Sequence, residues 1–135
     1  MTYEAILRDV KPLVSRRFTC ATATGIAKGT YLKGTDPSTA SACTAEADFF
    51  VGFAHADVNK STDTAFNTET SVTADKGGIY ELTASGAITA NAPVMVAAPG
   101  NQVMEAGAEV SFGVVIGIAR ETAVDAEQIN VEVFP

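Results

Sequence analysis

Short apolar runs separated by turn-forming residues make up the chain from Phe18 onward, and this pattern is typical of β-structure. The last run, residues 129–134, alternates regularly between apolar and polar positions. Its Ile and Val residues are predicted to face the core, while Asn130, Glu132 and Phe134 face outward. Because a phenylalanine on the outward side needs a partner, we expect Phe134 to contact another subunit.

Three segments dense in Gly, Pro, Asn and Asp punctuate these runs, at residues 34–38, 75–78 and 98–101. Proline fixes φ, and Gly and Asn tolerate positive φ, so each segment is predicted to form a turn. The runs between them are predicted strands: residues 31–32, 49–51, 79–82, 94–96 and 114–116.

An ordered pair of sequence blocks occurs twice and predicts an internal duplication. In the first half the blocks are residues 26–32 and 51–54, and in the second half they are residues 88–94 and 116–119. Gly29 and Asn91 hold matching positions in the first block, where a turn with positive φ is expected. Gly52 and Gly117 lie inside apolar strands and predict a bulge or a close backbone approach, as where a sheet bends into a barrel.

These patterns predict an all-β fold, a small barrel or sandwich made of two related halves, with an N-terminal arm. The arm is expected to span residues 1–17, and a single β domain to span residues 18–135. Within that domain the repeats cover about residues 18–56 and 77–121, a polar loop covers 57–76, and residues 129–134 form a closing strand.

The predicted arm differs from the rest of the chain, because its apolar residues fall at helical spacing and do not alternate. Pro12 removes a backbone donor and disfavours helix at Lys11, so both a short helix and an extended strip remain open. The segment is apolar and basic. It can pack on its own domain or on a partner, and the pattern does not decide between them.

The net charge of −7 is unevenly distributed along the 135 residues. Residues 1–33 hold six Lys or Arg against two Asp or Glu, a net charge of +4, which leaves −11 for the remainder. An acidic body repels nucleic acid, so the expected partner of the basic end is a protein surface. No apolar stretch is long enough for a membrane helix and no signal peptide is recognisable, so synthesis in the cytoplasm is expected.

No metal or cofactor is expected from the sequence. Cys20 and Cys43 are predicted to be buried free thiols, because a chain without an export signal meets a reducing environment. With His55 they remain short of four zinc ligands, and their spacing matches no zinc pattern. Oxygen-bearing residues alternate from Asp57 to Asp63 as at the start of a calcium loop, but the turning glycine and the bidentate glutamate are missing.

The chain is not expected to be an enzyme. His55 and Asp57 would share one face of a strand, and the expected interpretation is a surface contact, since no nucleophile accompanies them. Neither Ser85 nor Ser111 has the glycine that a nucleophile elbow requires. Glu105 and Glu109 lack the aromatic or polar surroundings of a sugar-binding cleft and are interpreted as surface residues.

In their order along the chain, several blocks resemble the small capsid decoration, or cement, proteins of tailed phages, a family whose members show two similar β halves. The head decoration protein of phage lambda is a more distant analogue. The resemblance runs from Phe18 to Pro135 and rests on residues 51–54, 78–82, 88–94, 116–119 and 129–134.

The resemblance implies a β-tulip-like fold and a structural virion protein on the outer capsid surface. Such a protein binds the major capsid protein, bridges neighbouring capsomers through many contacts and often forms a homotrimer. In this chain the arm would make the contact, and its removal with residues 1–17 is expected to leave a folded domain that no longer binds capsids. The expected capsid-binding residues are Ile6, Leu7, Arg8, Val10, Lys11, Arg16 and Arg17.

The alternative is a receptor- or carbohydrate-binding β module of a phage tail or fibre. Such modules usually present aromatic rings to a sugar, whereas this chain has no Trp and only three Tyr.

Overall fold

The computed structural model describes residues 5–9, 14–20, 25–58, 70–107 and 114–135, and of residues 7–9 it describes the backbone. The regular secondary structure of these residues consists of β-strands, as the sequence predicts. The strands are β1 (Ile6–Asp9), β2 (Val14–Thr19), β3 (Tyr31–Asp36), β4 (Thr39–Ala42), β5 (Phe50–Ala54), β6 (Ser71–Lys76), β7 (Gly78–Thr83), β8 (Pro93–Ala97), β9 (Gln102–Glu105), β10 (Val115–Ala119) and β11 (Gln128–Val133).

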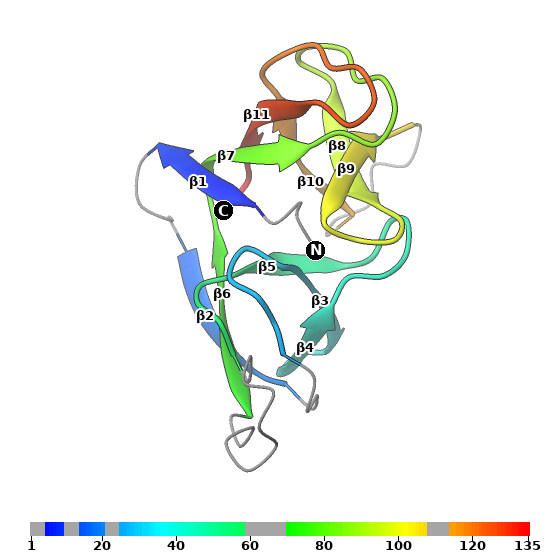
Figure 1. Cartoon of the computed structure of the whole chain (residues 1–135). Coiled ribbons are helices and arrows are strands. Elements are labelled where there is room, and N and C mark those ends of the chain that lie inside the picture. The colour runs from blue at the N-terminus through cyan, green and yellow to red at the C-terminus, as the bar shows by residue number, and fades with distance from the viewer. Residues whose placement is uncertain (1–4, 10–13, 21–24, 59–69, 108–113) are drawn as a thin grey trace.

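Two stacked β units make up the molecule (Figure 1). The first is a closed barrel with the strand order β2-β4-β3-β5-β6. The second is a six-stranded sheet with the order β1-β7-β11-β10-β8-β9. Apart from β1, the first half of the chain forms the barrel and the second half forms the sheet. The prediction of an all-β barrel or sandwich from two related halves is confirmed.

The strand order itself shows the duplication. The barrel order β4-β3-β5-β6-β2 matches β9-β8-β10-β11-β7 of the sheet, strand for strand. The ends of the series meet in both halves, through a parallel pair Thr19–Thr39 in the barrel and a parallel bridge Ala84–Val103 in the sheet. Strand β1 is additional to this shared pattern, and it pairs with the outer edge of β7.

The repeated glycines occupy equivalent irregularities in the two halves. Gly52 lies opposite Leu32 and Gly117 lies opposite Val94, and a register shift adjoins each pair. A Cβ on Gly117 would lie 2.3 Å from the Glu132 carbonyl oxygen, so the neighbouring strand approaches too closely for a side chain. The predicted bulge with close backbone approach is confirmed at both positions.

Two hydrophobic cores fill the molecule. One lies inside the barrel, and the other fills the sheet unit and extends to the aromatic residues of the barrel that face it. There Phe53 packs edge-on against Tyr31 and Phe50, and its ring centroid lies 4.5 Å from that of Tyr80. Edge-on packing is a favoured geometry for aromatic pairs. Because Phe53 belongs to the barrel and Tyr80 to the sheet, this cluster joins the two units.

The turn at 98–101 also joins the two units. It connects β8 to β9, and a Cβ on Gly100 would lie 2.0 Å from the Cys43 carbonyl oxygen, so only glycine fits against the barrel here. The next residue, Asn101, is buried and has a φ of 59°. Its Oδ1 accepts a hydrogen bond of 3.0 Å from the Tyr31 backbone N–H.

The turn predicted at residues 75–78 is a sharp bend between two strands. Lys76 ends β6, Gly78 begins β7, and Gly77 between them has a φ of 86°. The chain passes here directly from the barrel to the sheet (Figure 1).

The segment predicted as an arm contributes strands to both units. Residues 6–9 pair with β7, and residues 14–17 belong to β2, which continues to Thr19 and pairs with β6 along its whole length. Of the two open conformations, the described residues adopt the extended one. The boundary placed after residue 17 falls inside a barrel strand, because pairing with β6 extends the strand beyond what the apolar pattern indicated.

In the C-terminal strand β11, Ile129, Val131 and Val133 are buried, as the alternation predicts. Among the described residues no helix is long and apolar enough to span a membrane.

Candidate docking surface

The residues expected to bind a capsid are divided between the two units. Ile6 lies on β1 at the edge of the sheet and is 44 % exposed. Leu7 and Arg8 belong to the same strand, while Val10 and Lys11 fall outside the described residues. The described members of the predicted set therefore lie on one strand of the sheet and one strand of the barrel, and their role in capsid binding stays a prediction.

Arg16 and Arg17 lie on β2 of the barrel and point to opposite sides, because side chains alternate along a strand. Arg16 Nη2 donates a hydrogen bond of 3.0 Å to the Pro37 carbonyl oxygen, in the turn between β3 and β4. Its guanidinium carbon lies 5.1 Å from the centre of the Phe18 ring. Arg16 thus spans the gap between β2 and the β3–β4 turn.

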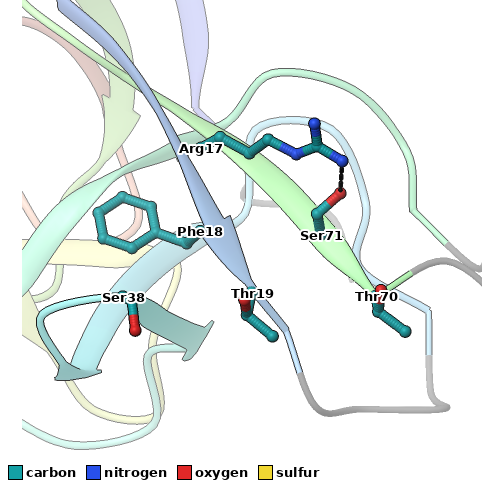
Figure 2. Close-up of a pocket in the computed structure, with 6 residues that line it drawn as sticks. All are labelled: Arg17, Phe18, Thr19, Ser38, Thr70 and Ser71. Atoms are coloured by element: carbon teal, nitrogen blue, oxygen red, sulfur yellow. Dashed lines mark hydrogen bonds between the residues drawn. The ribbon is translucent and has the colours of Figure 1, made fainter.

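Arg17 crosses the opposite face of the strand and donates from Nη2 to the Ser71 Oγ, 2.9 Å away on β6. Figure 2 shows this bond, with Phe18 directed away from it toward Ser38. Both arginines are exposed. They present two positive charges on one short strand of an acidic protein.

One edge of β2 is largely open. On the other edge the strand pairs with β6 through six successive residues, from Val14 to Thr19. On the largely open edge, the only pairing within the described part of the chain is that of Thr19 with Thr39 of β4. On this edge residues 14–18 therefore face the β3–β4 turn, and no strand among the described residues lies beside them.

A shallow hollow of about 390 Å³ adjoins this edge, at the end of β2 (Figure 2). Its lining comprises hydroxyl groups, the Phe18 ring and one guanidinium, with no carboxylate among the lining residues Arg17, Phe18, Thr19, Ser38, Thr70 and Ser71. The nearby Asp36 already accepts a hydrogen bond from the Ser38 backbone N–H, and this bond lowers the pKa of Asp36. The hollow suits a polar or negatively charged group.

Phe134 follows β11 and is 42 % exposed, so it faces outward as predicted. Its backbone N–H donates to the Ile116 carbonyl oxygen, which fixes the position of the residue. The subunit contact remains a prediction. Beside it on the sheet surface Arg120 Nε donates to Glu132 Oε1 over 3.0 Å.

His55 is bound by a carboxylate other than the expected one. Its Nδ1 lies 2.7 Å from Oδ2 of Asp75, which is buried and also accepts a hydrogen bond of 2.6 Å from Ser15 Oγ. Asp57 instead accepts from the Lys28 backbone N–H. Position along the chain favoured Asp57, but β6 brings Asp75 beside the end of β5.

The Ser15–Asp75–His55 cluster places the carboxylate in the centre. In a catalytic triad the imidazole lies between the hydroxyl and the carboxylate, so that it can take the hydroxyl proton. Here the hydroxyl binds the carboxylate directly. The geometry makes this cluster a connection between β2, β5 and β6.

Cys20 and Cys43 are buried and are not joined in a disulfide, as predicted. Burial raises the pKa of Cys43 to about 12, so its thiol stays protonated at neutral pH. No group of three or more metal-ligating His, Cys, Asp or Glu residues occurs in the described ranges. The calcium-like segment after Asp57 and the residue Glu109 lie outside those ranges, and Glu105 accepts a hydrogen bond from the Thr89 backbone N–H.

Sequence reasoning selected Arg16 and Arg17 but missed the surface they belong to. The open edge depends on where β4 begins relative to β2, which is a matter of tertiary pairing and leaves no local signal. The Thr and Ser residues of the hollow come from three separate segments of the chain.

A solved structure shares this architecture. The head fiber gp8.5 N base of bacteriophage phi29 superimposes with a TM-score of 0.56, covering 90 % of this chain and 93 % of that one at 18 % sequence identity. The two proteins have the same fold. No protein-family model matches the sequence, and no curated protein matches it either. At this identity the similarity to the head fiber base establishes architecture alone.

Proposed function

We propose that this chain is a non-enzymatic structural protein of a phage virion, which binds the outer surface of the capsid. The observation that carries the proposal is the shared fold with a head fiber base, which extends over nine tenths of both chains. Independently, the order of the sequence blocks resembles phage capsid decoration proteins. Both similarities support a structural protein of a phage virion, and its place on the outer surface is part of the proposal.

The charge distribution supports a protein partner. The body is acidic, while Arg16 and Arg17 are exposed on the two faces of β2. The partner is the major capsid protein, with acidic groups facing these two arginines. Exposed Ile6 and Phe134 supply apolar contacts, Ile6 at the capsid and Phe134 between subunits of a homotrimer.

The finer mechanism is bridging of neighbouring capsomers. A single contact of this size is weak, but a trimer that engages several capsomers at once gains strength through effective concentration. The result is a shell that resists expansion from within, achieved without any chemical step.

The test is co-sedimentation of the purified full-length chain with undecorated heads of the virus that encodes it. We expect saturable binding to expanded heads and a higher temperature of head disruption after binding. Mass measurement of the free protein by light scattering tests the trimer. Absence of head binding, together with specific binding to a glycan array, would reject the proposal and favour the receptor-binding alternative.

A further inference from the structure

The two halves differ at one equivalent strand edge. In the sheet, β7 pairs with β11 on one side and with β1 on the other. Its counterpart in the barrel, β2, pairs with β6 on one side, and in the described part of the chain only Thr19 is paired on the other. The duplicated fold therefore accepts an antiparallel strand at this position in one half, and in the other half no described strand occupies it.

The residue equivalence follows from the backbone hydrogen bonds. Thr19 pairs with Ser71 at the start of β6, and Thr83 pairs with Gln128 at the start of β11. The next residues make matching bonds, from Cys20 N–H to the Thr70 carbonyl and from Ala84 N–H to the Glu127 carbonyl. Counting back two residues, Arg17 corresponds to Glu81, the residue opposite Ile6 of β1.

The backbone of β2 is oriented to receive a strand. Thr19 N–H points to the open side, because it donates to the Ser38 carbonyl over 2.8 Å. Backbone groups alternate along a strand, so the N–H and C=O groups of Arg17 and Ser15 point to this side as well. These groups form a short row like the one that β1 uses on β7.

The side chains indicate the charge of the occupant. Arg16 reaches across the open side to the Pro37 carbonyl oxygen, and Arg17 lies on the other face of β2, beside Ser71 of β6. The equivalent strand in the sheet carries Glu81 at the position of Arg17. The adjoining hollow has one guanidinium, four hydroxyls and no carboxylate in its lining. A strand with acidic residues fits this edge, since opposite charges on facing strands stabilise the pair.

We propose that the open edge of β2 binds an extended acidic segment of the capsid protein as an additional antiparallel strand, a proposal that rests on the function proposed above. Backbone hydrogen bonds at Ser15 and Arg17 supply affinity, and the arginines select for carboxylates. A second copy of this chain is a poorer occupant. Its own N-terminal strand reads Ile-Leu-Arg-Asp, which has no net negative charge to match the arginines.

The test separates the contribution of the side chain to binding from that of the backbone N–H, at the single position of Arg17. Arg17→Ala and Arg17→Pro both remove the guanidinium, but only proline removes the N–H on the open edge, and it leaves the ladder with β6 intact. We expect Arg17→Ala to weaken binding to expanded heads several-fold in a salt-dependent manner. We expect Arg17→Pro to weaken it by a further factor of about ten, as for loss of a backbone hydrogen bond.

Hydrogen exchange of the unmodified chain keeps the test independent of how well the proline variant folds. On binding to heads, the amides of Ser15 and Arg17 should gain protection, while those of Arg16 and Phe18, which face β6, should stay as they were. Head binding without protection at Ser15 and Arg17, or equal binding by the two variants, would overturn the strand proposal alone. Protection that arises in concentrated protein without heads would identify a second copy as the occupant and also overturn it. Failure of the unmodified chain to bind heads would overturn the proposed function itself.

Discussion

The Oδ1 of Asn101 lies 3.0 Å from the backbone nitrogen of Tyr31. The β8–β9 turn of the sheet is therefore hydrogen-bonded to the first residue of barrel strand β3. Both residues are buried, and Asn101 holds a φ of 59° that few side chains tolerate. One residue therefore serves two purposes, as a turn former and as an acceptor between the units.

Replacement of Asn101 should be costly in a way that separates these two purposes. Asn101→Ala removes the acceptor and imposes positive φ on alanine, and we expect a loss of about 3 kcal/mol in the free energy of unfolding. Asn101→Gly removes the acceptor but tolerates the turn, so its loss should be about 1 kcal/mol smaller. Urea unfolding at neutral pH measures both, and equal losses would contradict the turn role.

The glycine at the second bulge gives a test of close strand approach. Gly117→Ala would place a Cβ 2.3 Å from a carbonyl oxygen of β11, and we expect a loss of about 3 kcal/mol or more. Gly86→Ala is the matched control, because no atom lies within 4 Å of its Cβ position and only its φ of 81° is unfavourable. That variant should lose about 1 kcal/mol. Similar thermal stability of the two variants would refute the packing argument.

Stability should fall at alkaline pH. Burial raises the pKa of Cys43 from 9.0 to about 12, and burial together with Asp75 raises that of Tyr80 from 10.0 to about 12. The unfolded chain ionises first, so the stabilising contribution is complete below pH 9 and is lost as the pH rises to about 12. One such group changes the free energy of unfolding by about 1.4 kcal/mol per pH unit.

Urea unfolding at successive pH values measures this slope. Tyr80→Phe is the control, because it removes a titrating group and retains the ring; it should reduce the slope above pH 10 and leave it unchanged below. A stability that stays constant from pH 8 to pH 12 would show that these groups titrate normally in the folded protein.

Truncation distinguishes the two N-terminal strands. Removal of residues 1–9 takes away β1, which is additional to the duplicated pattern, so we expect the barrel and its aromatic contacts to persist with lower stability. Removal of residues 1–17 also deletes four of the six residues of β2 and opens the barrel, so we expect it to abolish cooperative unfolding. Circular dichroism during thermal unfolding compares the two, and a cooperative transition in the longer truncation would support a separate arm.

The sequence was sufficient for the strands, the turns and the duplication, because each has a local cause. Alternation predicted the inward side of β11, and the paired glycines predicted both bulges. The N-terminal segment was harder, since Ile6 and Val14 show helical spacing although both lie in strands. Their conformation comes from pairing with β7 and β6, whose sequence positions lie more than fifty residues away.

In the candidate site, too, some features were predictable from the sequence and others were not. Arg16 and Arg17 were recognisable from their charge. The open edge beside them was not, because it results from the single point at which β4 meets β2. The bond between His55 and Asp75 was missed for a similar reason, since it depends on the pairing of β5 with β6, which brings residues twenty positions apart side by side.

The connection between the two units at Gly77 is too short to let them move independently. A longer linker would allow each unit to tilt while its own strands stayed paired. Here the last residue of β6 and the first of β7 are separated by one glycine, so any force that pulls the units apart is carried at once into two hydrogen-bonded ladders. Under tension this protein should behave as a single stiff element and fail by loss of strands, not by rotation at a hinge.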